Sequence, residues 1–322
     1  MPALRSLSLV ALCVLAAAAT ACAPASAPQG RTPPPQVRAP SFAAAPLLWE
    51  VTSQRGQRAW IYGTLHTGGA TYVPQAAWDA LAHSTTFVME TDIDHIDQND
   101  VIARAMLPSD QSLEKLMSAE SWKRLVAAFK GKMTAEQLRR FKPWFVSVVL
   151  AQSFLPGGEA TDQALKARAS EQGATLAYLE SWQEQLDALE AGTDVASLEL
   201  MLADLDKARA ELDALVEAYR AGDVAAIVRI TTDPAAGMSP TALDRLLYAR
   251  NRAWVPRIEE LVAGGGAFIA VGAGHIPGPG GLIELLAFRG YQVKRVAPRE
   301  AAEVPAEIPP GAAPAPGVPA KP

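Results

Sequence analysis

The chain has 322 residues, of which 49% are hydrophobic and 20% are charged, and its formal net charge is -5. These values are ordinary for a folded globular protein, and the length allows one large domain or two smaller ones. The sequence contains no basic run and no stripe of basic and aromatic residues, which argues against nucleic-acid binding.

The first 22 residues are predicted to be an export signal. A positively charged start precedes an apolar run from Leu7 to Ala19, which has the length of a signal-peptide core rather than of a membrane span. The small residues before Cys22 resemble the bacterial lipobox, in which the cysteine carries the lipid anchor; ordinary signal cleavage is the alternative. By resemblance to bacterial sorting rules, Ala23 after the cysteine favours an outer-membrane lipoprotein on the periplasmic side of the envelope.

The composition also sets the limits of the folded region. Residues 23–46 are rich in Pro, Ala, Ser and Gln and are predicted to be a disordered tether, and residues 300–322 are predicted to be a disordered Pro/Ala-rich tail. The domain is therefore expected over residues 47–299. Its sequence has no cysteine, because Cys13 and Cys22 are the only two in the chain, so a disulfide, a thiolate metal site and a cysteine nucleophile are excluded.

The first part of the domain is predicted to alternate strands and helices. Two short apolar runs, Leu47–Thr52 and Ala59–Tyr62, predict a β-hairpin. A helix is expected over Gln75–His83, and a buried strand over Thr86–Met89 leads directly to Glu90.

Helices dominate the middle of the chain. The periodicity predicts helices over residues 119–129, 134–140 and 144–154, and a further helix that is capped by Thr161 and ends at Glu171. A buried strand over Thr175–Leu179 then ends at Glu180. Beyond it, one long helix is expected over Ala196–Ala221, and Gly222-Asp223 breaks it.

The last part returns to strands. The helical pattern continues over Leu243–Val262, where Pro256 predicts a kink. A strand over Ala267–Val271, a helix over Gly280–Gly290 and a strand over Tyr291–Val296 complete the domain. This order predicts an α/β fold: a central mixed sheet built from N- and C-terminal βα segments, with large helical insertions that form a cap.

Four chemically active residues follow predicted strands. His66 and His275 each end a Gly-x-x-His motif, and Glu90 and Glu180 follow two further strands. In open α/β sheets, sites lie at the carboxyl ends of the strands. A single histidine at a strand end is usually a structural residue. For this pair, the matching spacing alone favours a structural and a functional interpretation equally.

Two imidazoles and carboxylates without cysteine suit a divalent ion such as Mn, Co, Fe or Zn. Such an ion lowers the pKa of bound water to about 7, and Glu90 or Glu180 could serve as a ligand or as the general base. Arg250 and Asn251 lie in a predicted helix, where Arg250 is either an exposed cation or a clamp for a substrate carbonyl or carboxylate. His95, within the acidic run after Glu90, is expected on a solvated face.

Together these motifs resemble the TraB/PrgY/GumN family. The resemblance covers most of the folded region and rests on separated segments in the same order: Leu48-Trp49-Glu50-Val51-Thr52, Tyr62-Gly63-Thr64-Leu65-His66, Phe87-Val88-Met89-Glu90-Thr91-Asp92, Lys142-Pro143-Trp144, Tyr178-Leu179-Glu180-Ser181-Trp182-Gln183-Glu184-Gln185-Leu186, Arg250-Asn251 and Val271-Gly272-Ala273-Gly274-His275-Ile276-Pro277-Gly278. Ser181 and Trp182 stand where relatives often have Thr and an acidic residue, which leaves the role of the Glu180 segment open.

The family is similar to the Tiki metalloproteases and, more distantly, to erythromycin esterases and the haem-binding ChaN lipoproteins. The resemblance implies that His66 and His275 are metal ligands, that Glu90 is a catalytic or ligating carboxylate, and that Arg250 and Asn251 point at the site. It implies a metal-dependent, peptidase-like hydrolase of the cell envelope that acts on a peptide or small-molecule substrate. The alternatives are a non-catalytic lipoprotein that binds haem or another small ligand, and an accessory factor in exopolysaccharide export.

Overall fold

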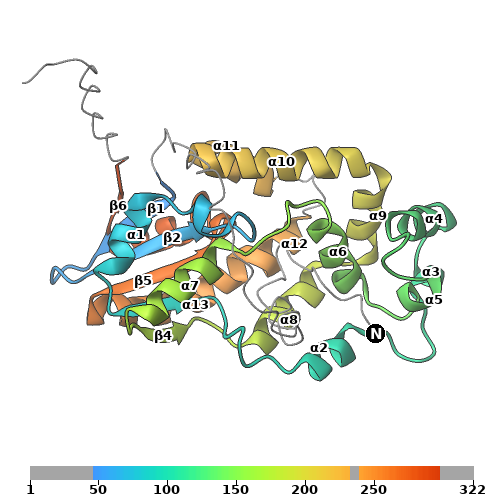
Figure 1. Cartoon of the computed structure of the whole chain (residues 1–322), viewed down its shortest axis with the longest axis horizontal. Coiled ribbons are helices and arrows are strands. Elements are labelled where there is room, and N and C mark those ends of the chain that lie inside the picture. The colour runs from blue at the N-terminus through green and yellow to red at the C-terminus, as the bar shows by residue number, and fades with distance from the viewer. Residues whose placement is uncertain (1–45, 233–238, 298–322) are drawn as a thin grey trace, which may run out of the picture.

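The computed structural model describes residues 46–232 and 239–297 (Figure 1). The predicted signal over residues 1–22 with Cys22, the tether apart from its last residue, and the tail over residues 300–322 lie outside the described residues. The fold is α/β, as predicted, with a six-stranded mixed sheet surrounded by many helices. Within the described ranges, none of the helices is both long and apolar enough to cross a membrane.

The predicted N-terminal hairpin is confirmed. Strand β1 (Leu48–Thr52) pairs antiparallel with β2 (Arg58–Thr64) in a register that places Leu48 opposite Tyr62. Gly56 forms the turn with a φ of 83°, a left-handed conformation that glycine adopts without steric cost. Strand β2 extends two residues beyond its predicted end, so that it ends shortly before His66.

Strands from both ends of the chain form one sheet, in the order β4-β3-β5-β2-β1-β6. The remaining strands are β3 (Thr86–Met89), β4 (Thr175–Tyr178), β5 (Ala267–Gly272) and β6 (Gln292–Arg295). Neighbouring strands β4, β3, β5 and β2 are parallel, whereas β1 is antiparallel to both β2 and β6. The carboxyl ends of the four parallel strands therefore lie along one edge of the sheet.

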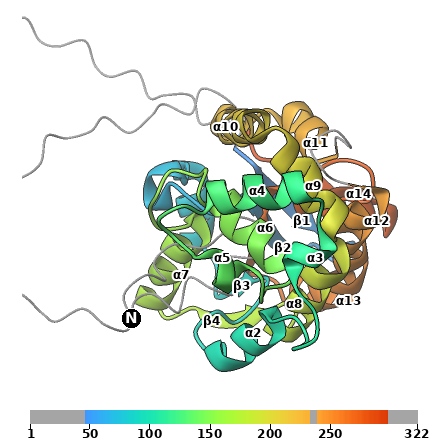
Figure 2. The ribbon, with the colours of Figure 1, turned by 90° about the vertical axis from the view of Figure 1, so that its right-hand side faces the viewer.

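Helices cover both faces of the parallel strands. Figure 2 shows α7 (Thr161–Glu171) on one side of the strands, and α13 (Ala249–Gly264) and α14 (Leu282–Phe288) on the other. Helix α1 (Gln75–Ala82) packs against α7. Burial on both faces explains why the central strands are continuously apolar rather than alternating, and the side chains of Phe87, Ile61, Phe268 and Val271 are fully buried.

The helical insertions lie beyond the carboxyl end of the sheet and form a cap with a second apolar core (Figure 1). Its fully buried side chains include Leu113, Leu125, Leu138, Val146 and Leu198. The cap comprises α2 (Gln98–Ala105), α3 (Leu113–Leu116), α4 (Ala119–Ala128), α5 (Ala135–Leu138), α6 (Pro143–Gln152), α8 (Trp182–Gly192), α9 (Val195–Ala203) and α12 (Pro240–Leu243). Helices α10 (Leu205–Ala221) and α11 (Val224–Thr232) follow the cap helices in the chain, and their buried side chains belong to the core of the sheet.

Two helix predictions were wrong in detail. The single helix expected over Ala196–Ala221 is divided into α9 and α10 at Asp204, whose side chain accepts a hydrogen bond from the backbone N–H of Lys207 at 2.9 Å and so caps α10. The helical pattern expected over Leu243–Val262 is helical in the structure but not uniform. It contains a π-helical turn, Asp244–Tyr248, which joins α12 to α13 and ends directly before the helix that carries Arg250. Pro256 lies inside α13, which continues to Gly264.

Candidate functional site

The sheet edge brings the strand-end residues together. Glu90 follows β3, Glu180 follows β4, and His275 lies three residues after β5. His66 lies two residues after β2, on the loop that lines the same cavity as Glu90 and His275. Arg250 enters this group from α13 and is buried, as are Glu90 and His275. A cluster of charged side chains inside a protein requires close pairing, because isolated buried charges are strongly disfavoured.

The guanidinium of Arg250 supplies that pairing for two carboxylates. Its Nη2 lies 2.6 Å from Glu90 Oε2 and 2.6 Å from Glu180 Oε1, and its Nε donates to Glu180 as well, at 3.1 Å. Trp254 Nε1 donates to Glu180 Oε2 at 3.0 Å, and the carbonyl of Leu246 accepts from Arg250 Nη1 at 3.1 Å. The planar fork of donors on arginine makes such a shared arrangement possible, and lysine could not reproduce it.

Glu90 is held as a carboxylate. Its Oε1 accepts a hydrogen bond from the backbone N–H of Gly272 at 2.7 Å, and its Oε2 accepts from Gln185 Nε2 at 3.1 Å as well as from Arg250. Burial alone raises the pKa of Glu90, but the charge of Arg250, together with the hydrogen bond from the backbone N–H of Gly272, outweighs it and lowers the pKa to about 2.

Gly272 leaves room for this contact. A Cβ at this position would lie 3.3 Å from Glu90 Oε1 and 3.6 Å from His275 Cδ2. The glycine of the second Gly-x-x-His motif therefore lets the backbone approach the carboxylate closely enough to donate a hydrogen bond.

His275 is neutral, and one tautomer is specified by its partners. Asn251 Nδ2 donates to the carbonyls of His275 and Gly280 at 3.1 and 2.9 Å, so Asn251 Oδ1 faces His275 Nδ1 at 2.7 Å. This network assigns the proton to Nδ1, which leaves the Nε2 lone pair to accept from Arg250 Nη1 at 3.1 Å. Burial, followed by the charge of Arg250, lowers the pKa of His275 to about 3 despite the nearby Glu90.

The loop that carries His66 is held by Thr161. The Thr161 hydroxyl accepts from the backbone N–H of Leu65 at 2.7 Å and donates to the carbonyl of Leu65 at 2.9 Å. Thr161 was predicted to be the N-cap of its helix; that prediction was wrong, because Ala160 is the N-cap and Thr161 is the first residue of α7. The hydroxyl thus holds the backbone next to His66 instead of capping a helix.

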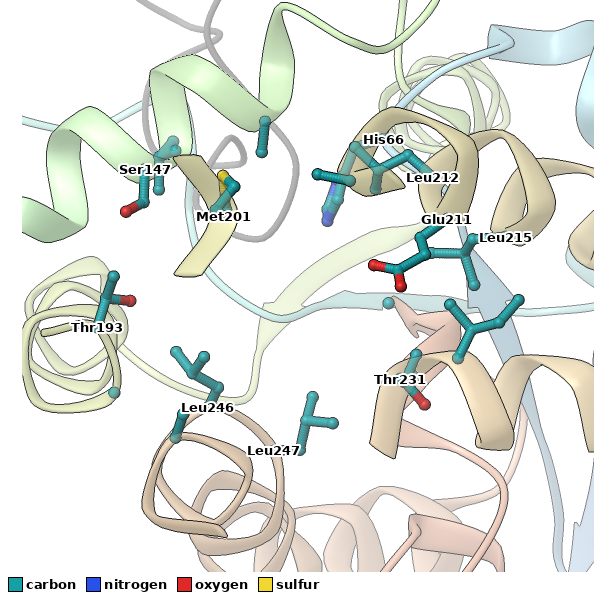
Figure 3. Close-up of a pocket in the computed structure, with 18 of the residues that line it drawn as sticks. His66, Ser147, Thr193, Met201, Glu211, Leu212, Leu215, Thr231, Leu246 and Leu247 are labelled. Carbon is teal, nitrogen blue, oxygen red and sulfur yellow. The ribbon is translucent and has the colours of Figure 1, made fainter. Parts of the chain in front are cut away.

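A cavity of about 390 Å³ opens above the charged cluster. His66, Glu90, Arg250 and His275 line its inner end, and apolar side chains from the cap line its walls. In Figure 3 the imidazole of His66 and the carboxylate of Glu211 both point into the cavity. A mostly apolar cavity of this size with a few converging polar groups is typical of a small-molecule site.

The comparison with known families fits this geometry. The model of the TraB/PrgY/gumN family matches residues 47–295. The chain belongs to the TraB/PrgY/gumN family. The match runs from β1 to β6 and so includes the whole sheet, the cap and the cavity between them. Comparisons with curated proteins and with solved structures find no match.

The predicted donor set of this TraB/PrgY/gumN family member does not fit a divalent ion as the side chains are arranged. Within residues 46–232 and 239–297, no three His, Cys, Asp or Glu side chains are grouped to hold a metal. His275 Nε2 and both oxygens of Glu90 already accept hydrogen bonds, and the permanent cation Arg250 lies between them. An added dication would meet that charge at short range. The divalent-ion prediction stays a prediction.

The other two histidines lie away from the cluster. His95 Nδ1 contacts Asp92 Oδ2 at 2.7 Å, and His83 Nδ1 contacts the carbonyl of Asp79 at 2.7 Å; both side chains are on the surface. His95 is exposed, as expected from the acidic run.

Sequence reasoning missed several residues of the site. Gln185 is the last residue of the Glu180-x-x-x-Glu184-Gln185 pattern, which lies in one of the segments that support the family resemblance. Its position in that pattern could have marked it as a residue of the site. Trp254 follows Arg250 by four residues, a spacing that puts both on one face of a helix. Thr161 and Glu211 reach the site through tertiary packing, and no local pattern marks them.

Proposed function

We propose that this TraB/PrgY/gumN family member is a hydrolase that holds its substrate in the cavity and cleaves an ester or amide bond beside His66. The observation that carries the proposal is the position of His66, which faces a ligand-sized cavity next to a buried, ionised carboxylate–guanidinium cluster. An imidazole that faces a mostly apolar cavity is a typical general base.

In the proposed reaction His66 removes a proton from water as the water oxygen forms a bond to the substrate carbonyl carbon. The bond to the leaving group then breaks, and the leaving group takes the proton from His66. Arg250 lies at the cavity wall, where its N–H groups are engaged by Glu90, Glu180, Leu246 and His275, so it orders the polar cluster beside the reacting carbonyl rather than donating to the oxyanion. Glu180, Asn251 and His275 act as positioning residues, because their polar atoms are engaged with each other and with Arg250.

The proposed activity belongs to the cell envelope. The predicted export signal and the lipid anchor at Cys22 would hold the domain at the periplasmic side of the outer membrane. The substrate is then a peptide or a small molecule that is present at that surface.

The test is the hydrolysis of ester and peptide substrates by the full-length protein in detergent. General-base catalysis contributes about 10²- to 10⁴-fold, so His66→Ala should reduce kcat/KM by that factor with an unchanged circular dichroism spectrum. His83→Ala is the matched control, because His83 is a surface histidine far from the cavity. A cleaved substrate whose kcat/KM is the same in wild type and His66→Ala would overturn the proposal.

Metal content tests the divalent-ion prediction separately. On the proposed mechanism, a chelator leaves the rate unchanged and elemental analysis finds less than one ion per chain. If the chelator abolishes hydrolysis and Mn, Co, Fe or Zn restores it, the attacking water would be activated by a metal ion rather than by His66.

Ligand binding without turnover is the second candidate, and it is favoured by the same observation, a histidine that faces an apolar cavity. A visible-absorption titration with haem decides it. A spectral shift that disappears in His66→Ala, with no hydrolysis of any substrate tested, would support binding alone. Absence of a shift in the wild type excludes haem.

A further inference from the structure

The walls of the cavity come largely from helices beyond the sheet edge, and most of their side chains are apolar; Glu211, which pairs with Lys207 at 3.4 Å, is a charged exception. Side chains from seven elements face the cavity, namely α6, α8, α9, α10, α11, α12 and the π-helical turn. Figure 3 shows Met201, Leu212, Leu215, Leu246 and Leu247 around the space. Burying a flexible apolar chain between such walls is favourable in proportion to the area that leaves water.

The hydroxyl groups on these walls are mostly engaged. Thr231 Oγ1 donates to the carbonyl of Ile227 at 2.8 Å, and Ser197 Oγ donates to Asp194 at 2.8 Å. Tyr219 donates its hydroxyl proton to the carbonyl of Gly63 at 3.0 Å. A peptide brings an N–H and a C=O with every residue, and each would need a partner, whereas only a few polar groups lie on these walls. A hydrocarbon chain makes no such demand.

One wall residue is different. Ser147 lies on α6 among apolar neighbours, lines the cavity and is only 7% exposed. Its Oγ is buried and makes no hydrogen bond to any of the described residues. Serine inside a helix commonly bonds back to a carbonyl of its own helix, and Ser147 does not. The Oγ has almost no surface open to the cavity in this rotamer, so a rotation about χ1 would bring it to a polar group on a ligand.

We propose that the substrate is an ester or amide of a single flexible acyl chain that carries one hydroxyl or oxo group. The reacting carbonyl lies beside His66, the chain lies between the apolar walls, and Ser147 Oγ hydrogen-bonds the hydroxyl or oxo group. The cleaved bond rests on the proposed hydrolase function, whereas the binding of the chain does not.

The first experiment measures chain-length dependence with 4-nitrophenyl esters from acetyl to dodecanoyl. Each methylene buried in the cavity should raise kcat/KM about fourfold until the cavity is full. Met201→Trp narrows the cavity and should move the optimum to shorter chains, whereas Leu116→Trp, at an exposed position outside the cavity, should not. A flat chain-length series in the wild type would overturn the acyl-chain proposal.

The second experiment measures the part played by Ser147. Loss of one hydrogen bond should weaken the binding of a hydroxylated acyl chain about fivefold in Ser147→Ala, with the binding of the unsubstituted chain unchanged. Ser197→Ala is the matched control, because Ser197 also lines the cavity but its hydroxyl is engaged by Asp194. If Ser147→Ala affects both chains equally, or neither, Ser147 does not recognise the polar group.

A binding assay separates this inference from the hydrolase proposal. The fluorescent fatty acid cis-parinaric acid should bind the full-length protein and be displaced by acyl chains according to their length. Binding of this kind without hydrolysis of any ester would leave the inference standing and reject the hydrolase. Hydrolysis of short esters that depends on His66, without binding of cis-parinaric acid, would do the reverse. Displacement by peptides but not by acyl chains would also reject the inference.

Discussion

At the scale of single residues, the site consists of one buried guanidinium that pairs with two buried carboxyl groups. Arg250 pairs with both Glu90 and Glu180, but the pKa values of the two carboxyl groups are shifted in opposite directions. The pKa of Glu90 is lowered, whereas burial, with the charge of Glu90, raises the pKa of Glu180 despite its contacts with Arg250. Glu180 lacks the backbone N–H that Gly272 gives to Glu90, and this difference accounts for part of the asymmetry.

Arg250→Met should be strongly destabilising, because it leaves two buried carboxylates without their partner. Removing one member of a buried ion pair costs about 3–5 kcal/mol, and urea unfolding measures the loss. Arg250→Lys should restore little of it, since an ammonium cannot bridge both groups. Arg252→Met is the control on the same helix: Arg252 is exposed and pairs with Asp244, so it should change stability by less than about 1 kcal/mol. Equal losses in the two variants would show that Arg250 does not balance the buried carboxylates.

Glu90 should also govern stability in acid. Its pKa lies at about 2 in the folded chain, below the ordinary value of 4.5. The contribution of ionised Glu90 to the free energy of unfolding is therefore fully present when the pH is above its ordinary pKa, and it is lost as the pH falls toward about 2. Between about pH 5 and pH 3, the free energy of unfolding should fall less steeply in Glu90→Gln than in the wild type. Glu120→Gln, at an exposed carboxylate, should keep the wild-type slope; a wild-type slope in Glu90→Gln would refute the prediction.

At the scale of elements, strands were predictable and the links between them were not. Short apolar runs next to Gly or charged residues located β2, β3 and β5, and with them the positions of His66, Glu90 and His275. The break at Asp204 was missed because the apolar periodicity of α9 continues into α10, and only a cap marks the boundary. Thr161 was misassigned because a threonine before a helical pattern predicts a cap. In the structure its hydroxyl instead hydrogen-bonds the backbone of Leu65, which is distant in the sequence.

Thr161→Val should loosen the loop that carries His66. The variant keeps the shape of the side chain and removes the hydroxyl that bonds both backbone groups of Leu65, which costs about 1–3 kcal/mol when the groups stay buried. Hydrogen exchange at the Leu65 amide should accelerate. Thr175→Val, at an exposed position in β4, should leave that exchange rate unchanged; protection of Leu65 that survives in Thr161→Val would show that other contacts hold the loop.

At the scale of the whole molecule, the cavity lies between two apolar cores. Leu212, Leu215 and Ile230 pack against the core of the sheet, whereas Leu189 and Leu246 belong to the core of the cap, and all five line the cavity. The α/β class and the existence of a helical cap were predictable from the order of elements. The cavity was not, because it depends on how the two cores meet, and no local pattern in the sequence encodes that contact.

The position of β5 has a consequence for the folding of the chain as it is synthesised. This strand is contributed by one of the last segments of the domain, yet it lies between β2 and β3, which do not pair with each other. Until Ala267–Gly272 has emerged, the hairpin of β1 and β2 and the pair of β3 and β4 remain two fragments with unpaired edges. Exposed edges of this kind invite association with other chains. A transcript truncated before this strand should therefore yield an aggregating or degraded product rather than a smaller folded domain.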